Sequence, residues 1–83
     1  MNAARRRERY YLTYPRHLIK EPLLYHLVKK FDLMFNIRGA SVSDEIGLVA
    51  VEFEGGNEQI ERALEWLRQS GVTVEPIEKN VIE

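Results

Sequence analysis

Apolar and polar residues follow two different periods along this chain, and these periods divide its first half into a strand and a helix. Residues 7–14 end in the β-rich run Tyr-Tyr-Leu-Thr-Tyr, and Pro15 after it stops the pairing, so we predict a first strand there. Four apolar residues then recur at i, i+3, i+4 and i+7: Leu24, Leu27, Val28 and Phe31. This spacing predicts a helix over residues 21–31, with Pro22 in its first turn.

The second half of the chain predicts two strands, a helix and a short last strand. Residues 35–42 and 48–54 are extended runs joined by the polar segment 43–47, which predicts a hairpin. Gly55 and Gly56 then break the strand, and Asn57 has the side chain of a helix N-cap. The helix that follows has an inward stripe of Ile60, Ala63, Leu64 and Leu67. Gly71 ends that helix, and residues 72–75 form a short last strand.

The predicted order is strand, helix, strand, strand, helix, strand. Because crossover connections are right-handed, this order favours a ferredoxin-like α+β fold, a βαββαβ sandwich. In it, a four-stranded antiparallel sheet carries both helices on one face. The first and third strands lie in the centre, and the second and fourth are edges. We expect one domain over residues 7–77, a flexible basic lead-in over 1–6 and a C-terminal tail over 78–83.

Composition narrows the chemistry that such a domain can perform. The 83 residues are 45% apolar and 30% charged, with a formal net charge of −1 and no cysteine. A globular domain without cysteine has no disulfides, thiolate metal sites or thiol nucleophiles. The basic N-terminus is followed by no long apolar stretch, so we expect neither a signal peptide nor a membrane span, and place the protein in the cytoplasm.

The residues that could act in catalysis lack the sequence motifs that catalysis requires around them. No glycine-rich elbow or phosphate loop surrounds any serine, and His17 and His26 lack carboxylates at metal-ligand spacing. Arg16 and Asn36 superficially resemble the arginine and asparagine of acylphosphatases, which share this topology. The segment 14–19 lacks the glycines of their phosphate cradle. We therefore expect no enzymatic activity, no metal and no cofactor.

Nucleic-acid binding is also disfavoured. Tyr10 or Tyr11 could stack a base on the open face of the sheet, but Glu52 and Glu54 would repel a phosphate backbone there. The run Arg5-Arg6-Arg7 is more typical of a solvated charge cluster. Trp66 is offset from the apolar stripe of its helix, so we expect it to flank the core.

Asn36 is the least expected residue in the pattern, because asparagine is disfavoured inside strands. One interpretation is structural: its amide bonds a neighbouring backbone group at the start of the strand. The other is functional: its amide offers a donor and an acceptor to a zwitterionic ligand or to a second subunit. The residue pattern alone slightly favours the structural interpretation.

The segment around Asn36 resembles the central motif of the NIL domain, a family named for an Asn-Ile-Leu tripeptide on its second strand. The matching run is Phe31-Asp32-Leu33-Met34-Phe35-Asn36-Ile37-Arg38-Gly39-Ala40. Further matches are Leu12-Thr13-Tyr14-Pro15, Glu21-Pro22, Ala63-Leu64-Glu65-Trp66-Leu67 and Gly71-Val72-Thr73-Val74-Glu75. The resemblance covers residues 7–77. Arg38 stands where the family motif has leucine.

The resemblance implies a ferredoxin-like fold and a regulatory role. Paired NIL domains of methionine-importer ATPases bind methionine and inhibit transport. By this resemblance we expect a small amino-acid-like ligand, methionine or related, near Asn36, Ile37 and Arg38. We also expect a homodimer through sheet edges and output through a transporter or enzyme partner. The alternative is a protein-interaction adaptor without a small ligand, in which the same edge strand accepts a partner strand.

Overall fold

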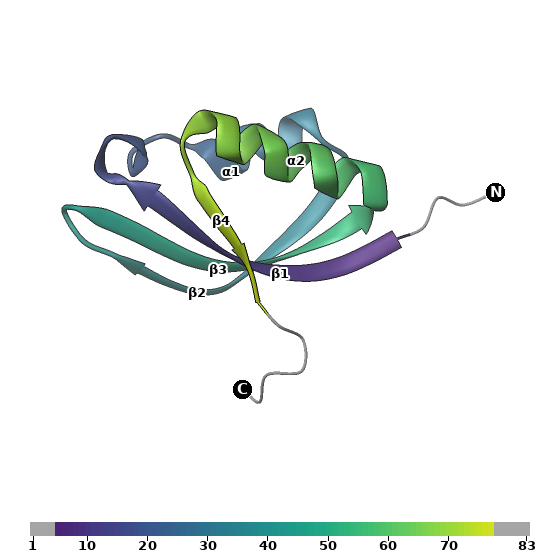
Figure 1. Ribbon diagram of the computed structural model, residues 1–83, viewed down its shortest axis with the longest axis horizontal. Helices are drawn as coiled ribbons and strands as arrows, with labels where there is room; N and C mark the ends of the chain where they lie inside the picture. Colours follow the sequence, from purple (N-terminus) through teal and green to yellow (C-terminus); the bar gives the residue numbers. More distant parts are fainter. Residues whose placement is uncertain (1–4, 78–83) are drawn as a thin grey trace.

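The sheet and helices have the order that the sequence predicts. The structure is a computed structural model that describes residues 5–77. Its elements are β1 (Arg5–Pro15), η1 (Arg16–Leu18, a 3-10 helix), α1 (Leu23–Lys30), β2 (Leu33–Val42), β3 (Ile46–Gly56), α2 (Asn57–Ser70) and β4 (Thr73–Pro76). The antiparallel sheet has the order β2-β3-β1-β4 (Figure 1). The ferredoxin-like α+β fold is confirmed, with β1 and β3 in the centre.

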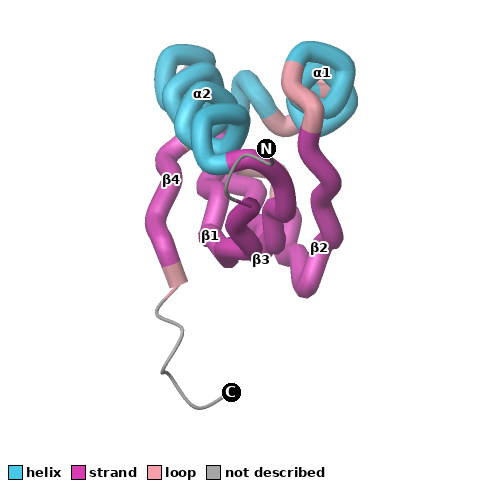
Figure 2. Tube along the Cα trace, turned by 90° about the vertical axis from the view of Figure 1, so that its right-hand side faces the viewer, coloured by secondary structure: helices cyan, strands magenta, loops and turns pink. Residues whose placement is uncertain are grey.

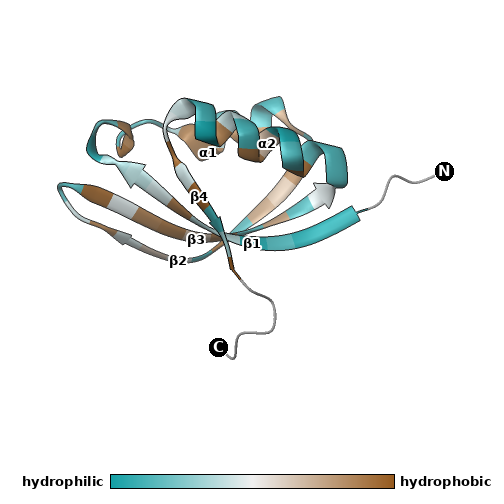
Figure 3. Cartoon of the chain, in the orientation of Figure 1, coloured by the Kyte–Doolittle hydropathy of each residue, from teal (hydrophilic) through white to brown (hydrophobic). Residues whose placement is uncertain are grey.

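Both helices lie on one face of the sheet, which is therefore the face that builds the core. Figure 2 shows α2 above β1 and β4, and α1 above β2. On α2 the predicted stripe is buried, and on β3 the alternation places Val51 and Phe53 beneath the helices, both fully buried. In Figure 3, much of α2 and the start of β1 have the colour of hydrophilic residues. Burial of these apolar side chains is the main force that holds the two layers together.

The first strand and first helix differ from the predicted bounds. β1 begins at Arg5, because Arg5 and Arg6 pair with Gly56 and Gly55, and it runs through Pro15. These two arginines, expected in the lead-in, therefore belong to the sheet; residues 1–4 and the expected tail 78–83 lie outside the described residues. α1 is shorter than residues 21–31. Pro22 (φ −80°, ψ 62°) precedes it, and extended Phe31 (φ −124°, ψ 140°) follows it.

The start of α2 corrects the prediction that Asn57 is its N-cap. Gly56 occupies the cap in an extended conformation, and no side chain caps the helix. Asn57 is instead the first helical residue, and its Oδ1 accepts a hydrogen bond from Arg6 Nη1 at 2.6 Å. β3 therefore runs through Gly55 and Gly56 directly into α2, and the two glycines do not end the strand early.

The end of α2 and the hairpin turn use different residues for their local geometry. Gly71 adopts the left-handed conformation (φ 108°) after α2, which confirms the predicted helix end. In the hairpin, the Ser43 hydroxyl accepts from the backbone N–H groups of Glu45 and Ile46 at 3.3 and 3.2 Å. The Ser43 side chain thus holds the local geometry of this turn.

Candidate functional site

Strand β2 is the edge of the sheet and is largely uncovered. From Asn36 to Val42 every residue of β2 is exposed, whereas Leu33 at its start is buried. α1 has only eight residues, so it covers the beginning of the strand and leaves the remainder open. Met34, Ile37 and Val42 are 62%, 55% and 63% exposed. An exposed edge strand with apolar side chains is a template for pairing.

The three motif residues do not converge on one pocket. Asn36 pairs with Glu52 on the open face of the sheet, and Ile37 pairs with Val51 on the helix-bearing face. Arg38 is the extra residue of a β-bulge, since the register shifts between Ile37 and Gly39. Within residues 5–77, the Asn36 side chain makes no hydrogen bond to a backbone group, so the structural interpretation of Asn36 is not observed.

The arginine cluster forms ion pairs across the sheet. On the open face Arg9 Nε lies 3.3 Å from Glu52 Oε2, and Arg7 Nη2 lies 3.5 Å from Glu54 Oε1. The Arg7 side chain is 65% exposed, as expected of a solvated charge cluster, and cross-strand pairing also aligns it with a carboxylate. Asn36, Glu52 and Arg9 form one polar row across β2, β3 and β1.

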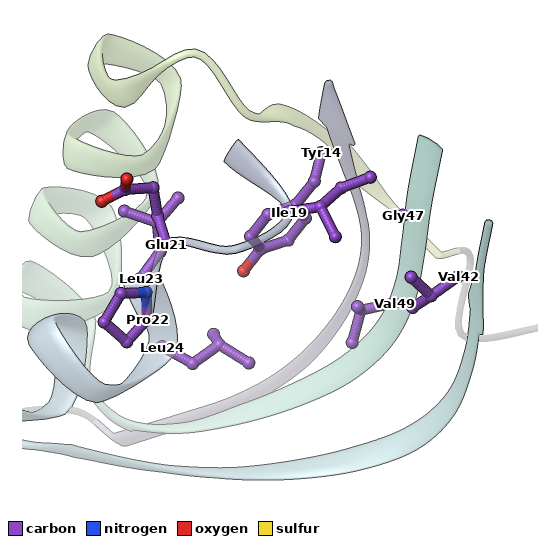
Figure 4. Close-up of a pocket in the computed structure, with 9 residues that line it drawn as sticks. All are labelled: Tyr14, Ile19, Glu21, Pro22, Leu23, Leu24, Val42, Gly47 and Val49. Atoms are coloured by element: carbon purple, nitrogen blue, oxygen red, sulfur yellow. The ribbon is translucent and has the colours of Figure 1, made fainter. Parts of the chain in front are cut away.

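A hollow of about 250 Å³ lies on the helix-bearing face, at the end of the sheet near the hairpin turn. Figure 4 shows it between the start of α1 and the neighbouring ends of β1, β2 and β3. Ile19 and Leu24 line it on the helix side, and Val42 and Val49 line it on the hairpin side. Glu21, which is exposed, lies at its rim. None of the three motif residues lines this hollow.

The hollow exists because a glycine faces the helices. Val42, Gly47 and Tyr14 form one row across β2, β3 and β1, and Gly47 has no side chain to fill its middle. A Cβ placed on Gly47 would lie 3.6 Å from Ile19 Cγ1 and 3.6 Å from Tyr14 Cβ, which is ordinary contact. Sequence reasoning assigned Gly47 to the turn. The signal in the sequence is that Gly47 lies two residues before Val49. In an alternating strand this spacing places both residues on the same, inward side.

Tyr14 supplies the polar atom nearest to the interior of this hollow. Its side chain is 7% exposed, and Figure 4 shows its hydroxyl oxygen on the α1 side of the hollow. Burial raises the pKa of the Tyr14 hydroxyl above its ordinary value, so it stays a neutral donor and acceptor in the physiological range. Burial also raises the pKa of Tyr10, which is 4% exposed and packs under α2. Only Tyr11 faces outward from the sheet, 42% exposed.

A second hollow, of about 730 Å³, adjoins the first and differs from it in charge. The two share Ile19 and Val42 in their linings. Arg16, His17 and Lys20 line the second hollow with Ser43 and Asp44. Three groups that carry or can carry positive charge thus face one carboxylate beside an apolar chamber.

The remaining residues singled out by the sequence occupy ordinary positions. Trp66 is half-buried beside the core, and its ring meets that of Phe31 edge-on with centroids 6.3 Å apart, which confirms the flanking prediction. His17 and His26 are exposed. Within residues 5–77, no three His, Cys, Asp or Glu side chains gather as metal ligands. Over the same range, no helix has the length and apolar character to cross a membrane.

Comparison with known proteins now places this fold in a family. The chain matches the NIL domain model over residues 8–76 and belongs to that family. No curated protein sequence matches it. Among solved structures, it is similar to the C-terminal domain of an ABC transporter/ATP-binding protein from Enterococcus faecalis. That crystal structure has a TM-score of 0.75 and 21% identity, over 88% of this chain and 86% of that one.

Proposed function

We propose that this NIL domain is a regulatory module that pairs with a second copy through β2 and binds a small amino-acid-like ligand, methionine or related, beside the paired strands. It acts through a partner, a transporter or an enzyme, and performs no catalysis itself. We place it in the cytoplasm. The observation that carries the proposal is the uncovered edge of β2, with exposed apolar side chains on a strand that could extend a neighbouring sheet.

The geometry of β2 suits pairing about a twofold axis. The strand runs from Leu33 to Val42, so its midpoint falls between Ile37 and Arg38. An antiparallel pair of β2 strands centred there would bring Asn36, Ile37 and Arg38 of both copies together. The Asn36 amide both donates and accepts, so it can bond either kind of backbone group on the second copy.

The same strand offers groups that suit the two ends of an amino acid. The Arg38 guanidinium is a bidentate partner for a carboxylate, and Ile37 supplies an exposed apolar surface for a side chain. The E. faecalis neighbour, a domain of an ABC transporter protein, supports a role beside transport, and the family membership supports a regulatory one.

Light scattering after size exclusion tests the pairing, and isothermal titration with methionine tests the ligand. We expect a dimer that Ile37→Lys converts to a monomer, because a charge on an edge strand opposes pairing. Titration heat should be present for the parent and lost in Asn36→Ala. A monomer at high concentration contradicts the pairing, and heat-silent titrations contradict the ligand.

The adaptor alternative uses the same edge of β2 for the strand of a different protein. A monomeric chain without a ligand, together with capture of a specific extended peptide that Ile37→Lys abolishes, would favour it over the regulatory module.

A further inference from the structure

The hollow of about 250 Å³ (the apolar hollow) and the hollow of about 730 Å³ (the basic hollow) adjoin each other, and neither is lined by Asn36, Ile37 or Arg38. Because Ile19 and Val42 belong to both linings, the two hollows lie side by side. Both lie on the helix-bearing face near the hairpin, whereas Asn36 faces the open side of the sheet. This region therefore needs its own explanation.

The contrast between two inward glycines of β3 shows that the apolar hollow is a specific feature. Gly55 also lies in a row beneath the helices, but the chain closes over it: a Cβ there would lie 2.8 Å from Leu33 Cβ. Gly47 is left with 3.6 Å to its nearest neighbours. One inward glycine is thus used for close packing, and the other keeps a space open.

The lining of the apolar hollow suits a small apolar group. At about 250 Å³ it is slightly below the range of ~300–1,000 Å³ typical of drug-sized ligands, so it suits a side chain of the size of leucine or methionine. Its walls are largely aliphatic, and the Tyr14 hydroxyl is a polar group in its lining. A ligand of this kind gains most of its affinity from burial of its chain.

The electrostatics fix the direction of the polar end. Glu21 lies at the rim of the apolar hollow and repels an anion there. Arg16 and Lys20 line the adjoining hollow and attract one, with His17 beside them and Asp44 as the opposing charge. A carboxylate is therefore favoured on the Arg16 and Lys20 side, with its chain directed past Ile19.

From these observations we infer that the double hollow is a binding site for a small carboxylate with an apolar chain. The chain lies over Gly47 and against Val49 and Leu24, and the carboxylate lies beside Arg16 and Lys20. Apolar amino acids and short branched-chain carboxylic acids share this chemistry. The inference goes beyond the proposed function, because it assigns a site that contains none of the three motif residues; from β2 it uses Val42, at the end of the strand.

Titrations followed by amide chemical shifts in ¹⁵N-labelled protein test the site with three probes. These are leucine, 4-methylpentanoate, which lacks the amine, and leucinol, which lacks the carboxylate. We expect both carboxylates to shift the amides of residues 16–24 and 42–49, and leucinol to bind about tenfold more weakly. Tighter binding of leucine identifies an amino acid, and tighter binding of 4-methylpentanoate identifies a simple acid. Shifts confined to residues 34–38, or equal binding of leucinol, overturn the inference.

Two pairs of variants separate this site from the proposed function. Gly47→Val fills the apolar chamber and should weaken both carboxylates by about tenfold or more, whereas Gly39→Val adds the same side chain on the open face and should not. Arg16→Ala with Lys20→Ala should weaken carboxylates but not leucinol. Asn36→Ala should leave all three titrations unchanged, so failure of the motif site and failure of this site are distinguishable.

Gly47→Ala provides a milder change if Gly47→Val does not fold. Its added methyl group takes up space in the apolar hollow, so it should weaken 4-methylpentanoate measurably while the spectrum stays that of a folded protein. Unchanged affinity overturns the inference. If Gly47→Val instead makes a dimer monomeric, and neither protein binds a probe, the hollow belongs to an interface between copies and the inference is wrong.

Discussion

The Arg6 guanidinium and the Glu61 carboxylate lie 2.7 Å apart, Nη1 to Oε2, and join the start of β1 to the beginning of α2. The same nitrogen donates to Asn57 Oδ1, and Nη2 donates to the Tyr10 hydroxyl at 3.3 Å. The hydrogen bond to Glu61 raises the pKa of the Arg6 guanidinium above its ordinary value. One arginine thus connects residues more than fifty positions apart in the sequence.

Arg6→Ala should lower the free energy of unfolding by about 1 kcal/mol. The variant loses charge-assisted hydrogen bonds, but the side chain of Glu61 is 58% exposed, so solvent screens part of their strength. Urea denaturation measures the change, and a double-mutant cycle with Glu61→Gln isolates the pair. Arg62→Ala is the matched control, because its contact with Glu58 is fully on the surface and should contribute less than about 0.5 kcal/mol. Equal losses in the two arginine variants would contradict this assignment.

Alkaline pH should destabilise the protein through Tyr14. Its pKa is raised by burial in the folded state, so the unfolded chain loses the hydroxyl proton first as pH rises above about 10. The folded state then binds more protons than the unfolded state, and stability falls with rising pH. Urea midpoints measured from pH 8 to pH 11 should fall less steeply in Tyr14→Phe. Tyr11→Phe, on the open face, should keep the slope of the parent; an unchanged slope in Tyr14→Phe would refute the prediction.

Gly71→Ala should destabilise the protein by about 1 kcal/mol or more. The residue has φ 108°, a conformation that side chains other than glycine rarely adopt, and its added Cβ would lie 3.1 Å from Leu18 Cδ1. Thermal denaturation measures the loss. Gly39→Ala is the control, because nothing lies within 4 Å of its added Cβ. A control as unstable as Gly71→Ala would show that the conformation after α2 is not the cause.

The two inward glycines of β3 should respond differently to the same methyl group. Gly55→Ala places a Cβ 2.8 Å from Leu33 Cβ and 3.3 Å from the Asp32 carbonyl oxygen, so the strands must move and about 1–3 kcal/mol is lost. Gly47→Ala meets only ordinary contacts at 3.6 Å and should be close to neutral or slightly stabilising. Urea denaturation of both variants compares them, and equal destabilisation would mean that Gly47 is packed as tightly as Gly55.

Periodicity was enough to predict the fold, because the strongest patterns belong to the buried elements. The α2 stripe and the alternation at Val51 and Phe53 state directly which side faces the core. Local boundaries were less predictable. Arg6 and Asn57 look like a lead-in residue and an N-cap until tertiary structure brings them to 2.6 Å, a contact across 51 positions that no local pattern encodes.

The candidate sites were harder to predict for a related reason. The motif directs attention to Asn36, Ile37 and Arg38 as consecutive residues, but the pleat of a strand sends neighbours to opposite faces. The hollow over Gly47 depends on the absence of a side chain between Tyr14 and Val42, residues from three different strands. A space of this kind is a property of the assembled sheet, so it is visible only in the structure.

The bulge at Arg38 has a consequence for what changes of chain length this domain tolerates. Inward positions of β2 are odd-numbered up to Ile37 and even-numbered from Ala40 onward, since Arg38 is counted in the sequence but not in the ladder. Deleting Arg38 would leave every β2–β3 partner in place, because Arg38 has no partner on β3. A deletion at Met34, inside the regular ladder, would turn part of the strand inside out. Arg38 is thus exposed and lies outside the β2–β3 ladder, so its side chain is available to a molecule that meets the edge of the sheet.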